Sequence, residues 1–352
     1  MKRIFYLAIL LVFACKSDNK EGKAQVQKPG YFSSVEVEPI LEADTLSIRA
    51  IEVIGNNLAF AGNKGVYGLY NRQANTWKTN VQKYDTLVPE FRAVASTPND
   101  FFMLSVASPA LLYKTGENGK MELVYEEDDE KAFYDSMAFW NDSEGIAMGD
   151  PTQNCLSVII TRDAGKTWKK LSCDVLPEAE EGEAAFAASN SNIAVKGDNT
   201  WILSGGKRSR VFYSPDKGKT WEVFETPLVQ GEATTGGYSI AFYDENNGFI
   251  IGGDYTKPKE NRANKAVTKD GGKTWQLVGK DKDPGYKSSV RYVPGSNAAE
   301  LVASGFSGIS YSKDSGSTWN KLSEEGFYTL RFIDDSTAYA AGKGRIALLH
   351  FK

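Results

Sequence analysis

One eight-residue pattern, [S/T]-x-D-x-G-x-[S/T]-W, constrains the fold of this chain more than any other feature of its sequence. It occurs four times, at 161–168, 214–221, 268–275 and 312–319. Its aspartates, at positions 163, 216, 270 and 314, are 53, 54 and 44 residues apart. Repeats with periods in this range are typical of propeller blades and similar arrays.

The residue types of this pattern suit a tight turn between two strands, which we call the box turn. The aspartate can accept hydrogen bonds from backbone N–H groups, the glycine tolerates a positive φ, and the tryptophan anchors the next strand. We therefore predict a structural rather than a catalytic role. The residues concerned are Asp163, Gly165, Trp168, Asp216, Gly218, Trp221, Asp270, Gly272, Trp275, Asp314, Gly316 and Trp319.

The box turn resembles the Asp-box (BNR) repeat of sialidases and related propellers. The resemblance covers eight residues in each of four copies, and it implies a propeller fold. It indicates little about function, because propellers with this repeat have many functions.

Seven β-like segments define the start of seven repeats, and the first two repeats have degenerate boxes. These segments are 47–51, 91–95, 135–139, 185–188, 238–242, 288–292 and 328–332. The seventh repeat ends after its third strand, 346–351, and the segment 32–39 can supply the fourth. We therefore predict an all-β fold over 31–352. It is a seven-bladed propeller of four-stranded antiparallel blades, closed by the N-terminal strand so that no edge is exposed.

The first 30 residues indicate export. Met1–Arg3 is basic, and the apolar run 4–14 is too short to span a bilayer. Cys15 follows Ala14, which resembles a bacterial lipobox, and Asp18 resembles the surface-export signal of Bacteroidetes lipoproteins. This implies a signal peptide (1–14), a lipidated Cys15 with a polar tether (15–30), and an outer-membrane lipoprotein, periplasmic or at the cell surface. The membrane would be contacted only through the lipid. An ordinary signal peptide is the alternative.

Two further cysteines flank the first box turn. The midpoint of Cys155 and Cys173 is residue 164, so a hairpin centred on this turn places them opposite each other. Opposed strand residues lie within disulfide range, and an exported protein meets an oxidising compartment. A disulfide and two free buried thiols both remain open.

The long loops should lie on the face opposite the box turns, which we call the loop face. In a four-stranded blade the 1–2 and 3–4 turns share one face, the box face. The 2–3 and 4–1 loops, including 78–90, 172–183, 226–237, 254–265 and 279–287, share the other. Long loops on a rigid ring usually carry the binding surface, so the loop face is the candidate site.

Four arginines align in the first strands of repeats six, seven, one and two, which are consecutive in a closed ring. They are Arg291, Arg331, Arg49 and Arg92. We expect them on one side of the central channel, where they would bind an anion such as a carboxylated sugar, a C-terminal carboxylate or an acidic peptide. Pairing with acidic neighbours is the alternative. Arg208 and Arg210 either add positive charge or are solvated loop residues.

A sialidase-like exo-glycosidase is one implied function. Sialidases combine such boxes with an arginine cluster, a Tyr nucleophile assisted by a Glu, and an acidic general acid. Phe91-Arg92 matches half of their Phe-Arg-Ile-Pro motif. Tyr328, with Tyr286 and Tyr238, could be the nucleophile, and Asp150 or Asp254 the acid. No complete catalytic set can be assigned from these residues.

The chain also resembles the photosystem II assembly and stability factors and their bacterial relatives, over nearly all of 31–352. These have seven blades, D-x-G-x-T-W repeats and an arginine patch, and they bind protein without catalysis. We therefore expect a binder of a protein, peptide or glycan, with the exo-glycosidase as alternative.

Several classes of function are disfavoured by the composition. The net charge of −4 and the lack of a basic stripe argue against nucleic acid as a partner. No dinucleotide-binding turn or C-x-x-C motif occurs, and His350 is the single histidine, so we expect no cofactor, no His-based triad and no metal site. The acidic runs 126–130 and 178–183 could bind Ca²⁺, but solvated loops are commoner. We expect a monomer.

Overall fold

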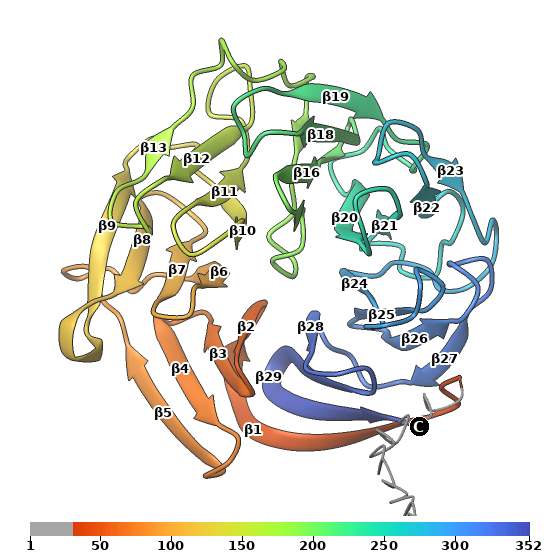
Figure 1. Cartoon of the computed structure of the whole chain (residues 1–352), viewed down its shortest axis with the longest axis horizontal. Helices are drawn as coiled ribbons and strands as arrows, with labels where there is room; N and C mark the ends of the chain where they lie inside the picture. Colours follow the sequence, from red (N-terminus) through yellow and green to blue (C-terminus); the bar gives the residue numbers. More distant parts are fainter. Residues whose placement is uncertain (1–30) are drawn as a thin grey trace, which may run out of the picture.

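The computed structural model describes residues 31–352, which form a ring of seven antiparallel sheets around a central axis (Figure 1). The predicted signal segment, Cys15 and the tether lie outside the described residues. No helix within 31–352 is long and apolar enough to cross a bilayer. A short 3-10 helix, η1 (Glu117–Gly119), accompanies the strands.

Six blades have their four strands in simple order from the axis outwards. Blades 1 and 2 contain β2 (Ala50–Ile54), β3 (Asn57–Ala61), β4 (Val66–Asn71), β5 (Thr76–Val81), and β6 (Phe91–Ser96), β7 (Phe101–Ser105), β8 (Ala110–Thr115), β9 (Met121–Glu127). Blades 3 and 4 contain β10 (Tyr134–Phe139), β11 (Gly145–Gly149), β12 (Ser157–Thr161), β13 (Lys169–Lys170), and β15 (Ile193–Lys196), β16 (Asn199–Leu203), β18 (Arg210–Ser214), β19 (Glu222–Glu225). Blades 5 and 6 contain β20 (Thr235–Phe242), β21 (Gly248–Asp254), β22 (Lys265–Thr268), β23 (Gln276–Leu277), and β24 (Ser289–Tyr292), β25 (Leu301–Gly305), β26 (Gly308–Ser312), β27 (Asn320–Ser323).

Blade 7 closes the ring with both ends of the described chain. It contains β28 (Thr329–Phe332), β29 (Thr337–Phe351) and β1 (Val35–Ser47), in the order β1-β29-β28. The start of β29 pairs with β28, and its end pairs with β1 from Val35↔Phe351 onwards. The predicted closure by the N-terminal strand is confirmed, although β1 extends eight residues beyond the expected end at residue 39.

The four box turns have a common hydrogen-bond pattern. Asp163 Oδ1 accepts from the Thr167 N–H at 2.9 Å and Oδ2 from the Thr167 hydroxyl at 2.7 Å, while the Gly165 N–H donates to Thr161 Oγ1. Gly165 has a φ of 74°. Asp216, Asp270 and Asp314 bind their own Thr residues in the same way. The aspartate carboxylates are therefore occupied within their turns.

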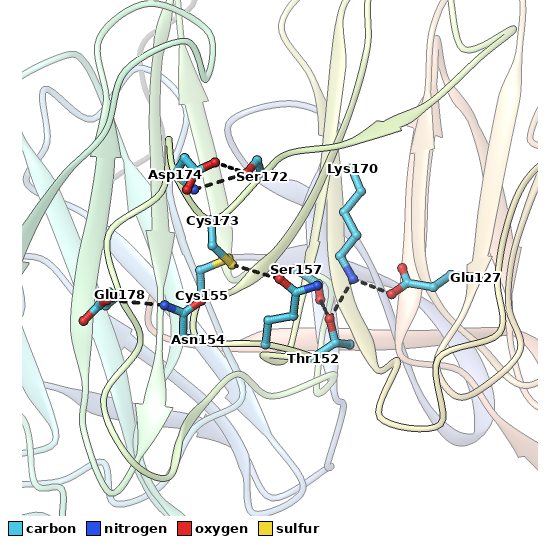
Figure 2. The surroundings of a disulfide bond; sticks show 11 residues. Glu127, Thr152, Asn154, Cys155, Ser157, Lys170, Ser172, Cys173, Asp174 and Glu178 are labelled. Atoms are coloured by element: carbon cyan, nitrogen blue, oxygen red, sulfur yellow. Dashed lines mark hydrogen bonds and ion pairs between the residues drawn. A yellow bond between two sulfur atoms is a disulfide. The ribbon is translucent and has the colours of Figure 1, made fainter.

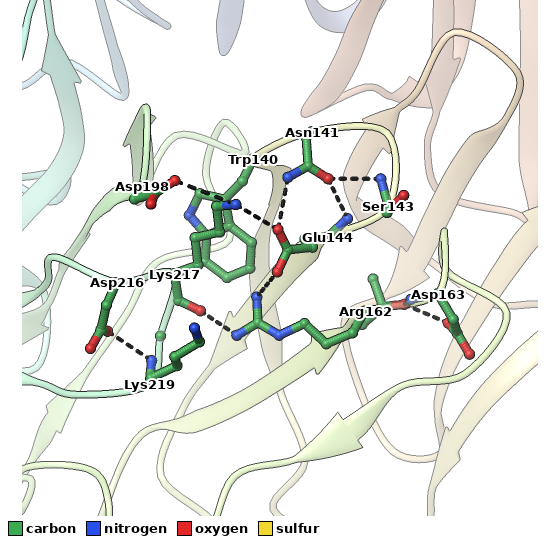
Figure 3. A network of polar contacts seen from close by, with 12 residues as sticks. Trp140, Asn141, Ser143, Glu144, Arg162, Asp163, Asp198, Asp216, Lys217 and Lys219 are labelled. Atoms are coloured by element: carbon green, nitrogen blue, oxygen red, sulfur yellow. Dashed lines mark hydrogen bonds and ion pairs between the residues drawn. The ribbon is translucent and has the colours of Figure 1, made fainter.

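Charged side chains tie adjacent box turns together (Figure 3). Glu144 accepts from Arg162 of blade 3 at 2.7 Å and from Lys217 of blade 4 at 2.6 Å. The hydrogen bond from Lys217, with those from Asn141 and the nearby Arg162 charge, lowers the pKa of Glu144 to about 2. This carboxylate therefore stays ionised and joins two blades.

Cys155 and Cys173 form a disulfide beside the hairpin of β12 and β13 in blade 3 (Figure 2). Their Cα atoms are 5.5 Å apart. Cys155 precedes β12 and Cys173 follows β13, so the bond joins the strand ends at the loop face. Of the two possibilities left open by the sequence, the structure contains the bonded one.

Blade 4 differs from the sequence prediction. Its innermost strand is β15, whereas the segment 185–188, expected in that place, lies outside any strand. The preceding β14 (Glu183–Ala184) pairs with β17 (Gly205–Gly206), which extends the sheet of blade 5. The alanine-rich composition of 185–188 fits a tightly packed position, but that position is not a strand.

Residues 185–192 form a plug in the central channel. The plug bonds to the inner strands or strand ends of all six other blades, so it must lie near the axis. Its partners are Arg49, Val94, Met137, Ser239 with Ile240, Ser288, and Thr329 with Arg331. Ser189, Asn190, Ser191 and Asn192 are all buried. The plug divides the channel into a loop-face end and a box-face end.

Candidate functional site

The loop-face end of the channel is a cavity of about 550 Å³. Backbone bulges interrupt the inner strands around it, because the pairing of β6, β10 and β20 each skips one residue. The skipped residues are Arg92, Asp135 and Tyr238. Such bulges often redirect side chains next to functional sites.

Two of the four predicted arginines, Arg49 and Arg92, line this cavity. The guanidinium carbon of Arg49 lies 4.1 Å from the centroid of the Tyr328 ring, and Nη1 donates to the carbonyl of Ala188 at 3.4 Å. Burial and the Arg92 charge lower the pKa of Arg49. Arg92 pairs with Glu90 at 2.7 Å. Within residues 31–352, no carboxylate forms an ion pair with Arg49 within 4.0 Å, so only Arg92 of this pair has a direct carboxylate partner.

Aromatic rings form another part of the cavity wall. Phe186 stacks on Tyr238 with ring centroids 3.8 Å apart, and Tyr238 meets Tyr286 edge-on at 4.8 Å. Phe306 and Tyr255 stand at the rim and remain 46% and 47% exposed. Exposed aromatic side chains beside a cavity are typical of binding surfaces for peptides and sugars.

The acidic candidates have different environments. Asp150 lines the cavity and accepts a 2.7 Å hydrogen bond from the Ala185 N–H, and burial raises its pKa to about 6. Asp135, which the sequence did not single out, is fully buried, and burial with the Asp150 charge raises its pKa. Asp254 does not line the cavity. Its carboxylate accepts from the N–H and hydroxyl of Thr256, which outweigh burial and lower its pKa.

The expectation that four arginines form one cluster is wrong. Arg49 immediately precedes β2 and corresponds in register to Tyr328, which precedes β28. Arg331 lies three residues further along its strand and corresponds to Glu52. The four aligned arginines are therefore two pairs on opposite sides of the plug. The segments that contain these arginines look alike in sequence, but the strand pairing shows that their registers differ by three residues.

Arg291 and Arg331 line a second cavity of about 490 Å³ at the box-face end. Arg331 donates to Thr329, Leu330 and the carbonyl of Asn190. Burial and the Arg331 charge lower the pKa of Arg291, and burial raises that of Glu52 despite both arginines. No ion pair within 4.0 Å involves either arginine in the described part of the chain.

Several other sequence expectations concern residues outside these cavities. Arg210 is buried and pairs with Glu183 at 2.5 Å, so it is not a solvated loop residue. Arg208 pairs with Glu225 at 2.7 Å on the surface. His350 lies 3.1 Å from Glu38 across β29 and β1. In residues 31–352, no three His, Cys, Asp or Glu side chains are placed to hold a metal ion.

The sequence gives little indication that residues 189–192 belong to a buried plug or that Asp135 lies at a bulge. Ser189-Asn-Ser-Asn192 has the composition of a surface turn, yet all four residues are buried. Asp135 opens the segment 135–139, but a bulge that reorients one residue leaves no pattern in a single sequence.

Comparison with known proteins places the fold but not the function. A family model described as sortilin/Vps10 (sortilin, neurotensin receptor 3) matches residues 156–286, fewer than half of the chain. No match was found among curated protein sequences.

Solved structures resemble nearly the whole chain. A structure of YCF48 bound to a D1 peptide has a TM-score of 0.63 at 14% identity, covering 93% of this chain and all of that one. YCF48 from Cyanidioschyzon merolae has a TM-score of 0.65 at 13% identity, with 91% and 99% covered. The GH74 xyloglucanase from Xanthomonas campestris has a TM-score of 0.62 at 12% identity, covering 89% of this chain and 53% of that one. At these identities the likenesses show that the chain has the propeller fold of these proteins.

Proposed function

We propose that this protein is an exported lipoprotein propeller that binds a carboxylate-bearing partner, a protein segment first, in the loop-face cavity. One observation carries the proposal. Arg49 and Arg92 share a cavity of about 550 Å³ with an aromatic wall, and only one of these arginines has a carboxylate partner.

Electrostatics favours an anionic ligand in this cavity. Burial and the neighbouring Arg92 charge both lower the pKa of Arg49, so the charged state of Arg49 is disfavoured in the free protein. A ligand carboxylate would offset this repulsion and could accept planar, paired hydrogen bonds from an arginine. The exposed rings of Phe306 and Tyr255 would contact the apolar part of the same ligand.

The structural neighbours support binding of a polypeptide. One neighbour, YCF48, is a propeller of this fold bound to a D1 peptide, and another is a xyloglucanase, which acts on a glycan. A glycan partner is therefore the second ligand class to test. Arg291 and Arg331 stay predicted anion ligands, now for the separate box-face cavity.

An array of peptides with free or amidated C-termini, printed beside a glycan array, tests the site. We expect the wild-type protein to select carboxylate-bearing ligands and Arg49→Ala/Arg92→Ala to bind them at least tenfold more weakly. Arg162→Ala/Arg208→Ala removes the same charge from the surface and should bind as wild type. Equal binding by wild type and the Arg49/Arg92 variant would overturn the proposal.

An exo-glycosidase is the second candidate, because a pKa of about 6 suits Asp150 to act as a general acid and Tyr328 lines the same cavity. The geometry favours it less, since Arg291 and Arg331 are absent from this cavity. A fluorogenic sialoside distinguishes the two. Turnover that is lost in both Asp150→Asn and Tyr328→Phe would replace binding with catalysis as the function.

Lipid attachment is proposed from Cys15 and its surroundings in the sequence. Labelling cells with an alkyne-tagged fatty acid should mark the wild-type protein. Cys15→Ser should remain unlabelled and appear in the soluble fraction. A labelled Cys15→Ser protein would contradict this part of the proposal.

A further inference from the structure

Each junction between neighbouring blades has its own apolar cluster, giving seven clusters for seven junctions. In five of them the chain inserts a tryptophan that follows a turn between the third and fourth strands. These are Trp77, Trp168, Trp221, Trp275 and Trp319. Between blades 6 and 7, Phe32 stacks on Phe351 and fills the space.

The inserted tryptophan and its turn pack against a large side chain of the preceding blade. Trp168 lies 6.3 Å from Phe102, and Trp319 lies 6.0 Å from Phe249, measured between ring centroids. Gly165 and Gly316 of the boxes pack on the same two rings. A Cβ atom on Gly165 would lie 2.2 Å from Phe102. These two junctions therefore combine a large ring on one blade with a tryptophan on the next.

The junction between blades 1 and 2 has neither. Ala59 lies three residues before Gly62, as Phe249 lies three residues before Gly252, so Ala59 takes the place of the large ring. Met121 begins β9 after the degenerate box of blade 2 and takes the place of the tryptophan. The apolar cluster of this junction includes Met121 only at its edge and does not include Ala59.

The result is a cavity of about 430 Å³ between blades 1 and 2, which we call the socket. Its apolar wall consists of Ile54, Ala59, Tyr67, Leu69, Phe101 and Met121. Leu69 is 40% exposed there. An apolar wall left open to solvent costs the fold stability, which an apolar occupant would restore by covering it.

The charges at the socket are unbalanced. Asp100 is neutralised by Lys114 at 2.7 Å, whereas Lys78 has no ion pair within 4.0 Å in residues 31–352. An occupant with a carboxylate near its ring would complement Lys78.

We propose that the socket binds an aromatic side chain, tryptophan above all, presented by an acidic segment of a partner polypeptide. The partner would supply in trans the ring that this chain supplies in cis at its other junctions. The socket lies between blades at the box face, whereas the proposed carboxylate site lies in the channel at the loop face. The two proposals can therefore fail separately.

The probe is the blocked peptide acetyl-Asp-Gly-Glu-Thr-Trp-amide, with versions in which Ala replaces Trp, or Asn and Gln replace the acidic residues. Binding is measured by methyl NMR on the full exported chain, with intermolecular NOEs to the methyl groups of Leu69 and Met121. We expect these NOEs with the parent peptide. We also expect at least tenfold weaker binding of the Ala peptide and weaker binding of the neutral peptide.

Met121→Trp restores the missing tryptophan, so it should weaken probe binding at least tenfold and raise the Tm by several degrees. Leu69→Glu, which places a carboxylate on the exposed wall, should also abolish binding and keeps the test valid if Met121→Trp fails to fold. Leu277→Trp is the matched control, because Leu277 ends β23, an outer strand beside an intact junction. It should bind the probe as wild type does.

Three outcomes would overturn the proposal. The probe could bind wild type and Leu69→Glu equally, or its NOEs could come from residues of the loop-face cavity. Alternatively, the wild type could sediment as a dimer and Met121→Trp as a monomer, which would assign the socket to a second copy of this chain. Arg49→Ala/Arg92→Ala should leave probe binding unchanged, which keeps this result separate from the proposed function.

Discussion

The side-chain amide of Asn190 donates a hydrogen bond of 2.7 Å to the backbone carbonyl of Val94, 96 residues earlier in the chain. The same amide accepts a bond from the Met137 N–H through Oδ1. One buried side chain of the plug therefore links the inner strands of blades 2 and 3, and removing it leaves two buried backbone groups without partners.

We predict that Asn190→Ala lowers the free energy of unfolding by about 3–5 kcal/mol. Each unsatisfied buried backbone group costs about 1–3 kcal/mol, and alanine is also strained at the φ of 52° found here. Urea denaturation followed by tryptophan fluorescence measures the change. Asn297→Ala is the control, because Asn297 has the same φ of 52° but lies exposed in a turn. Equal losses in both variants would show that the plug bonds contribute little.

The blade architecture could be predicted because it depends on local, repeated signals. The box turn fixes its conformation through bonds within eight residues, and apolar strands then follow with regular spacing. The plug could not be predicted in this way. Ser189, Asn190 and Ser191 bond to groups that are 48 to 141 residues distant, and such partners leave no local pattern.

The arginines illustrate a limit of a different kind. The sequence places the four arginines near the innermost strands. Their position along the channel axis, however, depends on the register of each strand, which the strand pairing sets. Arg49 and Arg331 differ by three residues in register, which places them at opposite ends of the channel. Composition and spacing alone cannot detect such a shift where bulges and loop lengths vary between blades.

The disulfide should contribute measurably to stability. Cys155 and Cys173 are separated by 18 residues, and closing a loop of this size restricts the unfolded chain by about 3 kcal/mol. We expect reductant to lower the free energy of unfolding by about that amount. Cys155→Ser/Cys173→Ser should have the lower stability from the outset and not respond to reductant. A wild-type chain that is equally stable with and without reductant would contradict the prediction.

Glu144 should make the protein sensitive to acid. Its folded pKa of about 2 is below the ordinary 4.5, mainly through the hydrogen bond from Lys217. The contribution of this carboxylate to the free energy of unfolding is therefore fully present above about pH 4.5 and is lost as the pH falls towards 2. After allowance for solvent screening, Glu144→Gln should be about 1–2 kcal/mol less stable than wild type at pH 7.

Denaturation curves at pH 7, 4 and 3 test this. The gap between wild type and Glu144→Gln should narrow as the pH falls. Glu42→Gln, an exposed change on β1, should track the wild type throughout. A gap that is constant with pH would assign the loss to packing rather than to the carboxylate charge.

Asp150 should have the opposite dependence. Burial raises its folded pKa to about 6 from an ordinary value of 3.8, so the fold favours the protonated carboxyl. The stability linked to this group is present below about pH 4 and is lost as the pH rises through 6. Asp150→Asn keeps an oxygen to accept the Ala185 N–H and removes the buried charge. It should therefore be about 1–2 kcal/mol more stable than wild type at pH 8, with no difference at pH 4.

Carbon-13 titration of the carboxyl groups gives an independent measure of the Asp150 pKa, because one aspartate near the cavity should titrate at about pH 6. If that resonance titrates near pH 4 instead, the fold does not favour the protonated carboxyl of Asp150, and neither the stability gain nor a general-acid role would hold.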